Sequence, residues 1–384
     1  MCKDQKWGKG SQGKEICDLL VVFENYIIIF SDKYCRFPSS GDLELDWSRW
    51  FKRAVWKSAN QIWGAERWLR DHPTRIFLDR ACTKPFPIPL PPSETASVIR
   101  IVVAHGSGEC CKSFFGGSGS LIIEPEIVGR HHFDPKVGAI APFRVGRLDE
   151  KKGFVHVIDD LSLDVLLRTL DTTPDFIRYL QCKEDFINSG SLGMAAGEEE
   201  LLAYYLTHTD DSDKHDFVFP KNYNSMLLGE GFWENFRNHA DRAAQIKENQ
   251  ISYAWDRLID HFTFHIMEGK TQAQSHSSIA ELEAPLRFMA RETRTKRRML
   301  AKGLLGILEK GAENDRAARV FIPVEPGDPF YVFLSFKAPP DKNYEEYQMV
   351  RRGLLEAYCK VVRHQHPEAM DIVGCSGQRL LDTC

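Results

Sequence analysis

The stretch GKEICDLLVVFENYIIIFSDK, residues 13–33, decides how this chain folds. It holds two apolar runs that are joined by Glu24-Asn25 and bounded by charged residues. Apolar runs of this length around a short polar turn predict an antiparallel β-hairpin. Such a hairpin brings Asp18, where the first strand starts, close to residues 31–33, where the second strand ends. Glu15 is expected at a helix end or in a loop just before the hairpin.

Carboxylates beside a lysine at one end of a sheet suit a metal-dependent phosphodiesterase. Carboxylate oxygens bind a hard divalent cation. A lysine such as Lys33 can orient the attacking water and neutralise phosphate charge. A purely structural role is the alternative, in which Asp18 caps one strand and Lys33 ends another. Because carboxylates enclosed in an apolar hairpin are costly without a cation or partner, the functional interpretation is favoured.

These residues resemble the core of the restriction-endonuclease-like nucleases, the PD-(D/E)xK superfamily. The family pattern has a helical Glu, an Asp that opens a hairpin, and an acid-x-Lys triplet on the next strand; Glu15, Asp18 and Lys33 fit it. The chain departs from the pattern at Ser31, where the family usually has an acid. Asp32 is acidic, but in a regular strand it points to the opposite face unless a bulge re-aims it. The resemblance covers roughly residues 10–80.

The resemblance implies a nuclease that hydrolyses DNA with Mg²⁺ or Mn²⁺, in a setting such as bacterial defence. It implies Asp18 as the central metal ligand, Glu15 as a second, and Asp32 or Ser31 completing the metal set. Lys33 would position the water, and Gln61 on the following helix would hold the metal's water shell or the scissile phosphate. Ser31 in place of an acid favours an alternative, a catalytically inactive nuclease-like binding or assembly module.

The pattern along the rest of the chain predicts an α/β (α+β) protein with a mixed sheet flanked by helices, of restriction-endonuclease-like type. We expect a nuclease core over 1–140, a mainly helical region over 141–315, and a β-β-α-β segment over 316–384. A helix is predicted over 47–70, where tryptophans are dense. These tryptophans pack in a core or form a platform for base stacking.

Composition narrows the class of protein. The chain has 384 residues and a net charge of −4, which gives no global signature of nucleic-acid binding. It has no run of 18 apolar residues and no apolar signal sequence at its start, so we expect a cytoplasmic protein without a membrane span. Ten cysteines are scattered without any C-x-x-C pair. Reduced, mostly buried thiols are expected, and a zinc site built from scattered Cys and His residues stays open.

Positive charge is concentrated in one segment of the second half of the chain. Residues 285–310 are rich in arginine and lysine, and the predicted nucleic-acid contacts are Arg294, Lys296, Arg297 and Arg298. The alternative is a solvated helix face without a partner. DNA is the expected partner, and a homo-oligomer or a protein partner stays open.

Overall fold

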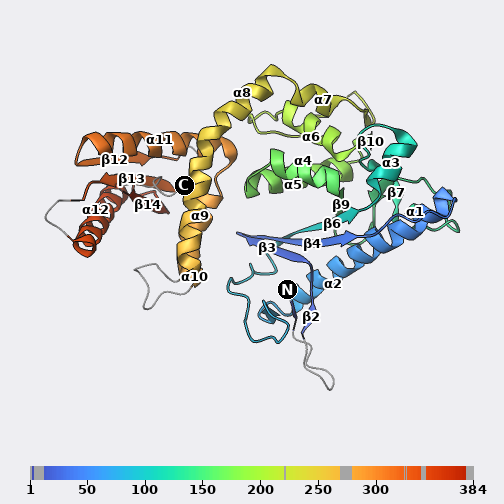
Figure 1. Ribbon diagram of the computed structural model, residues 1–384, viewed down its shortest axis with the longest axis horizontal. Coiled ribbons are helices and arrows are strands. Elements are labelled where there is room, and N and C mark those ends of the chain that lie inside the picture. Colours follow the sequence, from blue (N-terminus) through green and yellow to red (C-terminus); the bar gives the residue numbers. More distant parts are fainter. Residues whose placement is uncertain are drawn as a thin grey trace. The chain divides into compact units, whose positions relative to one another are not determined.

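The computed structural model describes residues 2–3, 13–219, 222–268, 279–323, 325, 327–338 and 343–377. The chain forms two compact units, Met1–Arg242 and Ala243–Cys384. The expected divisions at residues 140 and 315 therefore differ from the observed one. Both units are mixed α/β, with sheets flanked by helices (Figure 1).

The first unit is built on a four-stranded sheet in the order β3 (Leu19–Phe23), β4 (Tyr26–Tyr34), β6 (Ser97–His105) and β9 (His156–Asp159). Strands β3 and β4 form the predicted antiparallel hairpin, with Phe23 paired to Tyr26 at the turn. Strands β4, β6 and β9 run parallel. Because the carboxyl ends of parallel strands meet at one edge, whatever follows these three strands is brought together there.

One long helical segment covers the first face of this sheet. It consists of α1 (Leu43–Phe51), a π-helical turn η1 (Lys52–Trp56) and α2 (Lys57–Asp71). It starts earlier than the predicted 47–70 helix because Asp42 caps it, accepting a hydrogen bond from the Leu45 backbone N–H at 3.1 Å. Trp47 and Trp50 are fully buried, so core packing is confirmed for them and base stacking is excluded.

The opposite face is covered by α4 (Asp160–Thr169), α5 (Thr173–Asn188) and α6 (Glu198–Thr207). Side chains alternate along β4, as the pleat requires. Ile27 and Ile29 join the core beneath the long helical segment, whereas Ile28 and Phe30 join the core on the other side. Because this alternation continues along the strand, the two cores show which face of the sheet each residue at the end of β4 occupies.

Smaller elements complete the first unit. A short sheet has the order β2-β1-β5, formed by Lys14–Glu15, Cys2–Lys3 and Ile76–Phe77. A further sheet has the order β11-β10-β7-β8, formed by Met226–Leu228, Leu192–Ala195, Ile122–Val128 and Arg144–Arg147. The remaining helices are α3 (Gly108–Phe115), η2 (Gly129–His132), α7 (Phe232–Arg237) and α8 (Ala240–Asn249), the last of which crosses the unit boundary.

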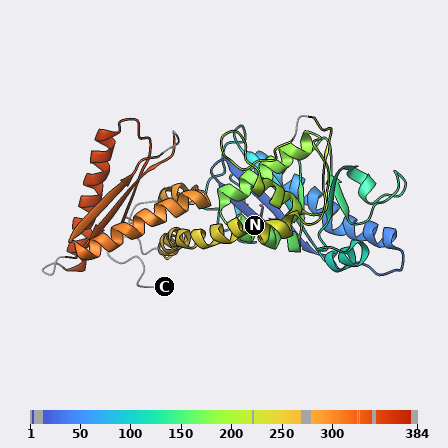
Figure 2. The same cartoon turned by 90° about the horizontal axis from the view of Figure 1, so that it is seen from above.

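The second unit carries a three-stranded sheet, with β13 (Phe330–Phe336) antiparallel to β12 (Arg316–Phe321) and parallel to β14 (Ile372–Gly377). Helix α12 (Tyr344–Gln365) packs along one face of it (Figure 2), which confirms the predicted β-β-α-β ending. The other face packs on η3 (Gln250–Ser252), α9 (Tyr253–Met267), α10 (Ile279–Ala290) and α11 (Arg294–Glu313). No helix in the described ranges is long and apolar enough to cross a membrane.

Candidate active site at the ends of the parallel strands

Asp18 lies at the entrance to β3, and its carboxylate is fixed by the neighbouring strand. The backbone N–H of Asp32 donates to Asp18 Oδ2 at 2.8 Å, and the backbone N–H of Asp18 donates to the Phe30 carbonyl at 3.2 Å. The Asp18 side chain is otherwise exposed. The hairpin therefore presents this carboxylate to solvent beside the residue that precedes Lys33, as the sequence predicted for the open end of the hairpin.

Residues 31–33 alternate between the two faces of the sheet. Ser31 is 1% exposed and lies with Lys33 on the face covered by the long helical segment, whereas Asp32 lies on the opposite face. The pairing of β4 with β6 runs without a shift from Ser31↔Val102 to Tyr34↔His105. No bulge re-aims Asp32, so its side chain stays on the face opposite Lys33, as expected for a regular strand.

Asp32 instead meets a histidine that sequence reasoning did not single out. His105 ends β6, and its Nε2 lies 2.6 Å from Asp32 Oδ1. The Nδ1 of the same ring lies 3.7 Å from Oδ2 of Asp160, the first residue after β9. Each of the three residues lies at the end of one parallel strand or follows it. The sequence feature that could have identified His105 is the position that these residues share, since each is a polar residue close to the end of a buried apolar strand.

The turn after β6 holds His105 close to the exit of β4. Gly106 has a φ of +98°, and a Cβ built on it would lie 2.4 Å from the Cys35 carbonyl oxygen. Only glycine tolerates both the conformation and the close approach. Trp50 Nε1 donates to the carbonyls of Cys35 at 3.0 Å and His105 at 3.2 Å. The helical segment thereby ties together the ends of the two strands that carry Asp32 and His105.

Asp159 and Asp160 are neighbours with different roles. Asp159 is buried and caps α4, accepting from the Ser162 N–H at 2.8 Å and the Leu121 N–H at 3.0 Å. Burial raises the pKa of Asp159, although these hydrogen bonds oppose the rise. Asp160 is exposed and is the carboxylate that faces His105. Asp159 therefore supports the fold, and Asp160 belongs with Asp32 and His105 at the exposed ends of the strands.

Glu15 does not lie on the expected element. It sits in β2, paired with Cys2 of β1, so the expected helix end or loop is wrong. Burial raises the pKa of Cys17 to about 12, and the negative charges of Asp18 and Glu15 add to this rise. Both carboxylates therefore act on the one thiol between them. The Cys17 thiol stays protonated at neutral pH and is not a nucleophile.

Gln61 is not brought to the cluster by any contact in the described part of the chain. It is exposed on α2, whereas Ser58, Ile62 and Ala65 are the positions that face the core. The helix turns its buried stripe toward the sheet, and Gln61 lies outside that stripe. Its predicted role at the metal or the phosphate stays a prediction.

The predicted metal set is only partly assembled. Over the described residues, no three His, Cys, Asp or Glu side chains gather in an arrangement that holds a metal ion. The donors that do fit a hard cation are the exposed carboxylates of Asp18, Asp32 and Asp160. The nearest cationic side chain of the motif is Lys33, which is half-buried and forms no ion pair within the described ranges.

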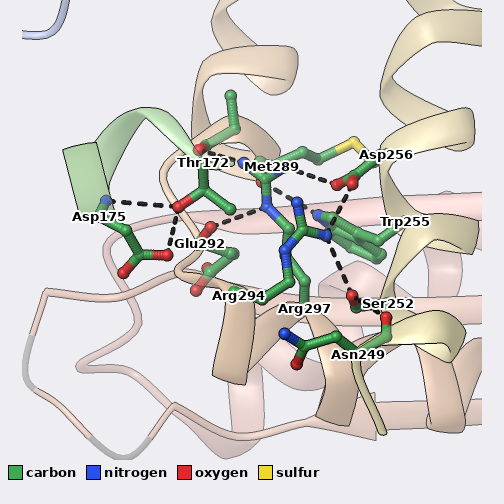
Figure 3. A network of polar contacts seen from close by, with 11 residues as sticks. Thr172, Asp175, Asn249, Ser252, Trp255, Asp256, Met289, Glu292, Arg294 and Arg297 are labelled. Atoms are coloured by element: carbon green, nitrogen blue, oxygen red, sulfur yellow. Dashed lines mark hydrogen bonds and ion pairs between the residues drawn. The ribbon is translucent and has the colours of Figure 1, made fainter. Parts of the chain in front are cut away.

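The basic residues 294–298 of the second unit are engaged within that unit. Arg294 Nη1 and Arg297 Nη1 both contact the Asp256 carboxylate, at 2.7 Å and 2.6 Å (Figure 3). Both arginines are less than a tenth exposed, so the expected solvated helix face is wrong for them. Lys296 pairs with Asp328, and Arg298 pairs with Glu248. These four residues, predicted to contact phosphate, are paired with carboxylates instead.

Comparisons with protein-family models, with curated proteins and with solved structures give no match to this chain.

Proposed function

We propose that this chain is a divalent-metal-dependent nuclease that hydrolyses DNA, with its site at the open ends of β3, β4, β6 and β9. The observation that carries the proposal is the fixed Asp18 carboxylate, which accepts at 2.8 Å from the backbone amide of Asp32, the residue before Lys33. Exposed carboxylates and a lysine at one edge match the chemistry of phosphodiester hydrolysis. The restriction-endonuclease-like type of fold is part of the same proposal.

Each residue has a distinct role in this proposal. Asp18 would hold Mg²⁺ through carboxylate oxygens, and the ion would supply charge neutralisation at the scissile phosphate. Asp32, on the opposite face of the sheet, would orient His105. Lys33 would neutralise charge that develops on the phosphate during attack. His105 receives its orientation from Asp32 and Asp160, which contact its two ring nitrogens.

The experiment is cleavage of plasmid and single-stranded DNA by the purified chain with Mg²⁺, Mn²⁺ or a chelator. Asp18→Ala and Lys33→Ala should each lower the cleavage rate by about 10²–10³, because a charge-stabilising group is removed. Asp211→Ala and Lys151→Ala remove exposed charges elsewhere in the first unit and serve as matched controls. Cleavage that survives in both site variants would place the active site elsewhere.

A second function is favoured by Ser31. The position two before Lys33 is a fully buried serine that cannot supply an anionic ligand. A nuclease-like module that binds DNA without cutting it is the function that this residue suits. It predicts DNA binding with no cleavage in either metal, and the same assay separates the two functions.

A further inference from the structure

A row of cations lies on the exposed side of the long helical segment and at the exit of β4. We name it the basic stripe; it consists of Arg36, Arg49, Lys52, Arg53 and Lys57. Lys52 and Arg53 follow Arg49 by three and four residues, and Lys57 follows Arg53 by four, so the helical members share one broad exposed face, away from the buried Phe51. The π-helical turn η1 falls in the middle of the stripe. Such turns are frequent at functional sites.

The stripe has no counter-ions of its own. In the part of the chain that the structure describes, none of its five side chains forms an ion pair with a carboxylate. The guanidinium of Arg53 donates only to the carbonyls of Arg49 at 3.2 Å and Arg36 at 3.4 Å. Two of the nearby carboxylates are committed elsewhere: Asp42 caps α1, and the buried Asp46 accepts from both Ser40 N–H and Ser40 O–H. Like charges this close repel one another, and an anionic partner would relieve that cost.

An open groove extends this positive surface. It has a volume of about 570 Å³ and runs between α1 and residues 130–140. Arg49, Lys52 and Lys136 line it together with the carboxylates Asp42 and Glu44 and the apolar Phe133 and Ile140. Asp134, on the same wall, is neutralised by its ion pair with Arg130. The groove therefore places cations and apolar side chains together, with Glu44 as an exposed carboxylate among them; cations beside apolar surface are the combination that a nucleic-acid strand contacts with its phosphates and bases.

The stripe is continuous with the proposed active site. Arg36 follows Lys33 by three residues of extended chain, about 10 Å at the usual rise of a strand. Arg53 reaches back to the Arg36 carbonyl, and Trp50 joins the strand ends that carry Asp32 and His105. A strand of phosphates lying along the stripe would run toward Lys33 and Asp18 at its end.

We propose that the basic stripe binds the phosphodiester backbone of the nucleic acid and leads it to Asp18 and Lys33. This inference rests on the nuclease function proposed above for its substrate. It replaces residues 294–298 by the stripe as the main phosphate-binding surface. The partner is a nucleic acid because the cations are spread along a line, as phosphates are, and lie beside an apolar groove.

The test is a salt titration of binding to a labelled DNA duplex in chelator, so that binding is measured without cleavage. The triple variant Arg49→Ala, Lys52→Ala, Lys57→Ala removes stripe cations that hold no side-chain hydrogen bond in the described structure. We expect the log–log salt slope to fall by about 0.9 for each duplex phosphate that the variant no longer binds. The control Lys302→Ala, Lys310→Ala, Lys360→Ala makes the same change of charge in the second unit and should leave the slope unchanged. Thermal melting verifies that both variants fold.

The outcomes separate the inference from the proposed function. Stripe-dependent binding with no cleavage in any metal supports the stripe and removes the nuclease function. Metal-dependent cleavage with equal salt slopes for both triple variants keeps the nuclease function and overturns the stripe. Polyglutamate is the competing polyanion; stripe-dependent affinity for it equal to that for DNA overturns the assignment to nucleic acid.

Discussion

The chain contains two arginine- and lysine-rich segments, and the structure treats them in opposite ways. In the second unit, Arg294 and Arg297 are buried against one carboxylate, Asp256. In the first unit, the cations of the basic stripe are exposed and carry no ion pair within the described ranges. The segment with the denser positive charge along the sequence, in the second unit, is thus the one whose charges are neutralised by carboxylates. Charge density in a sequence does not reveal available charge, because tertiary partners decide what remains for a ligand.

The two segments also depend on different supports. Asp256 holds Arg294 and Arg297, and Arg297 additionally donates to the Glu292 carbonyl at 2.8 Å and the Ala290 carbonyl at 2.7 Å. The stripe is supported by its buried face instead, where the neutral ring of His132 stacks on Phe51 at a centroid distance of 4.7 Å. Removing the Asp256 carboxylate should therefore lower the stability of the second unit, and protonating His132 should lower the stability of the first.

The largest effect is expected from Asp256→Ala. The substitution leaves Arg294 and Arg297 buried without their carboxylate, and breaking a buried ion pair typically costs about 3–5 kcal/mol. Urea unfolding of the second unit should show this decrease in stability. Asp260→Ala, on the exposed side of the same helix, is the matched control. A decrease as small as that of the control would mean that the two arginines do not depend on Asp256.

A smaller effect is expected from acid. Burial lowers the pKa of His132 from 6.5 to about 4, so the ring stays neutral in the folded state while the unfolded state takes up a proton. Stability contributed by this residue is complete above pH 6.5 and is lost as the pH falls toward 4, by up to about 1.4 kcal/mol per pH unit. Unfolding free energies between pH 7 and 4 should show this slope.

His132→Gln should reduce the dependence of the unfolding free energy on pH by the equivalent of about one bound proton. His131→Gln, which changes the exposed neighbouring histidine, should leave that dependence unchanged. Because His132 accepts from the Gly146 N–H at 2.9 Å, the variant is compared by slope and not by absolute stability. An unchanged slope in His132→Gln would assign the acid sensitivity to another group.

The smallest effect is expected from Arg298→Ala. Its partner Glu248 is 70% exposed, and exposed ion pairs contribute about 0–1 kcal/mol. Stability of the second unit should change by less than that, and the salt slope of DNA binding should not change. A salt slope lowered by about 0.9 would restore Arg298 as a residue that binds phosphate.

The local part of this architecture could be predicted from the sequence, and the assembled part could not. The hairpin, the long helix and the β-β-α-β ending follow from apolar periodicity over short stretches. The neighbour of β6 does not, because β9 starts only at His156, far beyond the reach of any local pattern around His105. The contact of His105 with Asp32 and Asp160 depends on that strand order. The pairing of Arg294 with Asp256 likewise spans 38 residues and leaves no periodic signal.

Strand β4 pairs on one side with β3, which is close to it in the sequence, and on the other side with β6, which is distant. The two pairings are therefore expected to form at different times during folding. Strand β3 is joined to β4 by two residues, whereas β6 pairs with β4 only after the long helical segment and the loop that follows it. Hairpins close within microseconds, while distant parallel pairing must first overcome the entropy of a long loop. We therefore expect the Asp18 carboxylate to meet the Asp32 backbone amide early in folding, and His105 to reach the Asp32 side chain only when the sheet is complete.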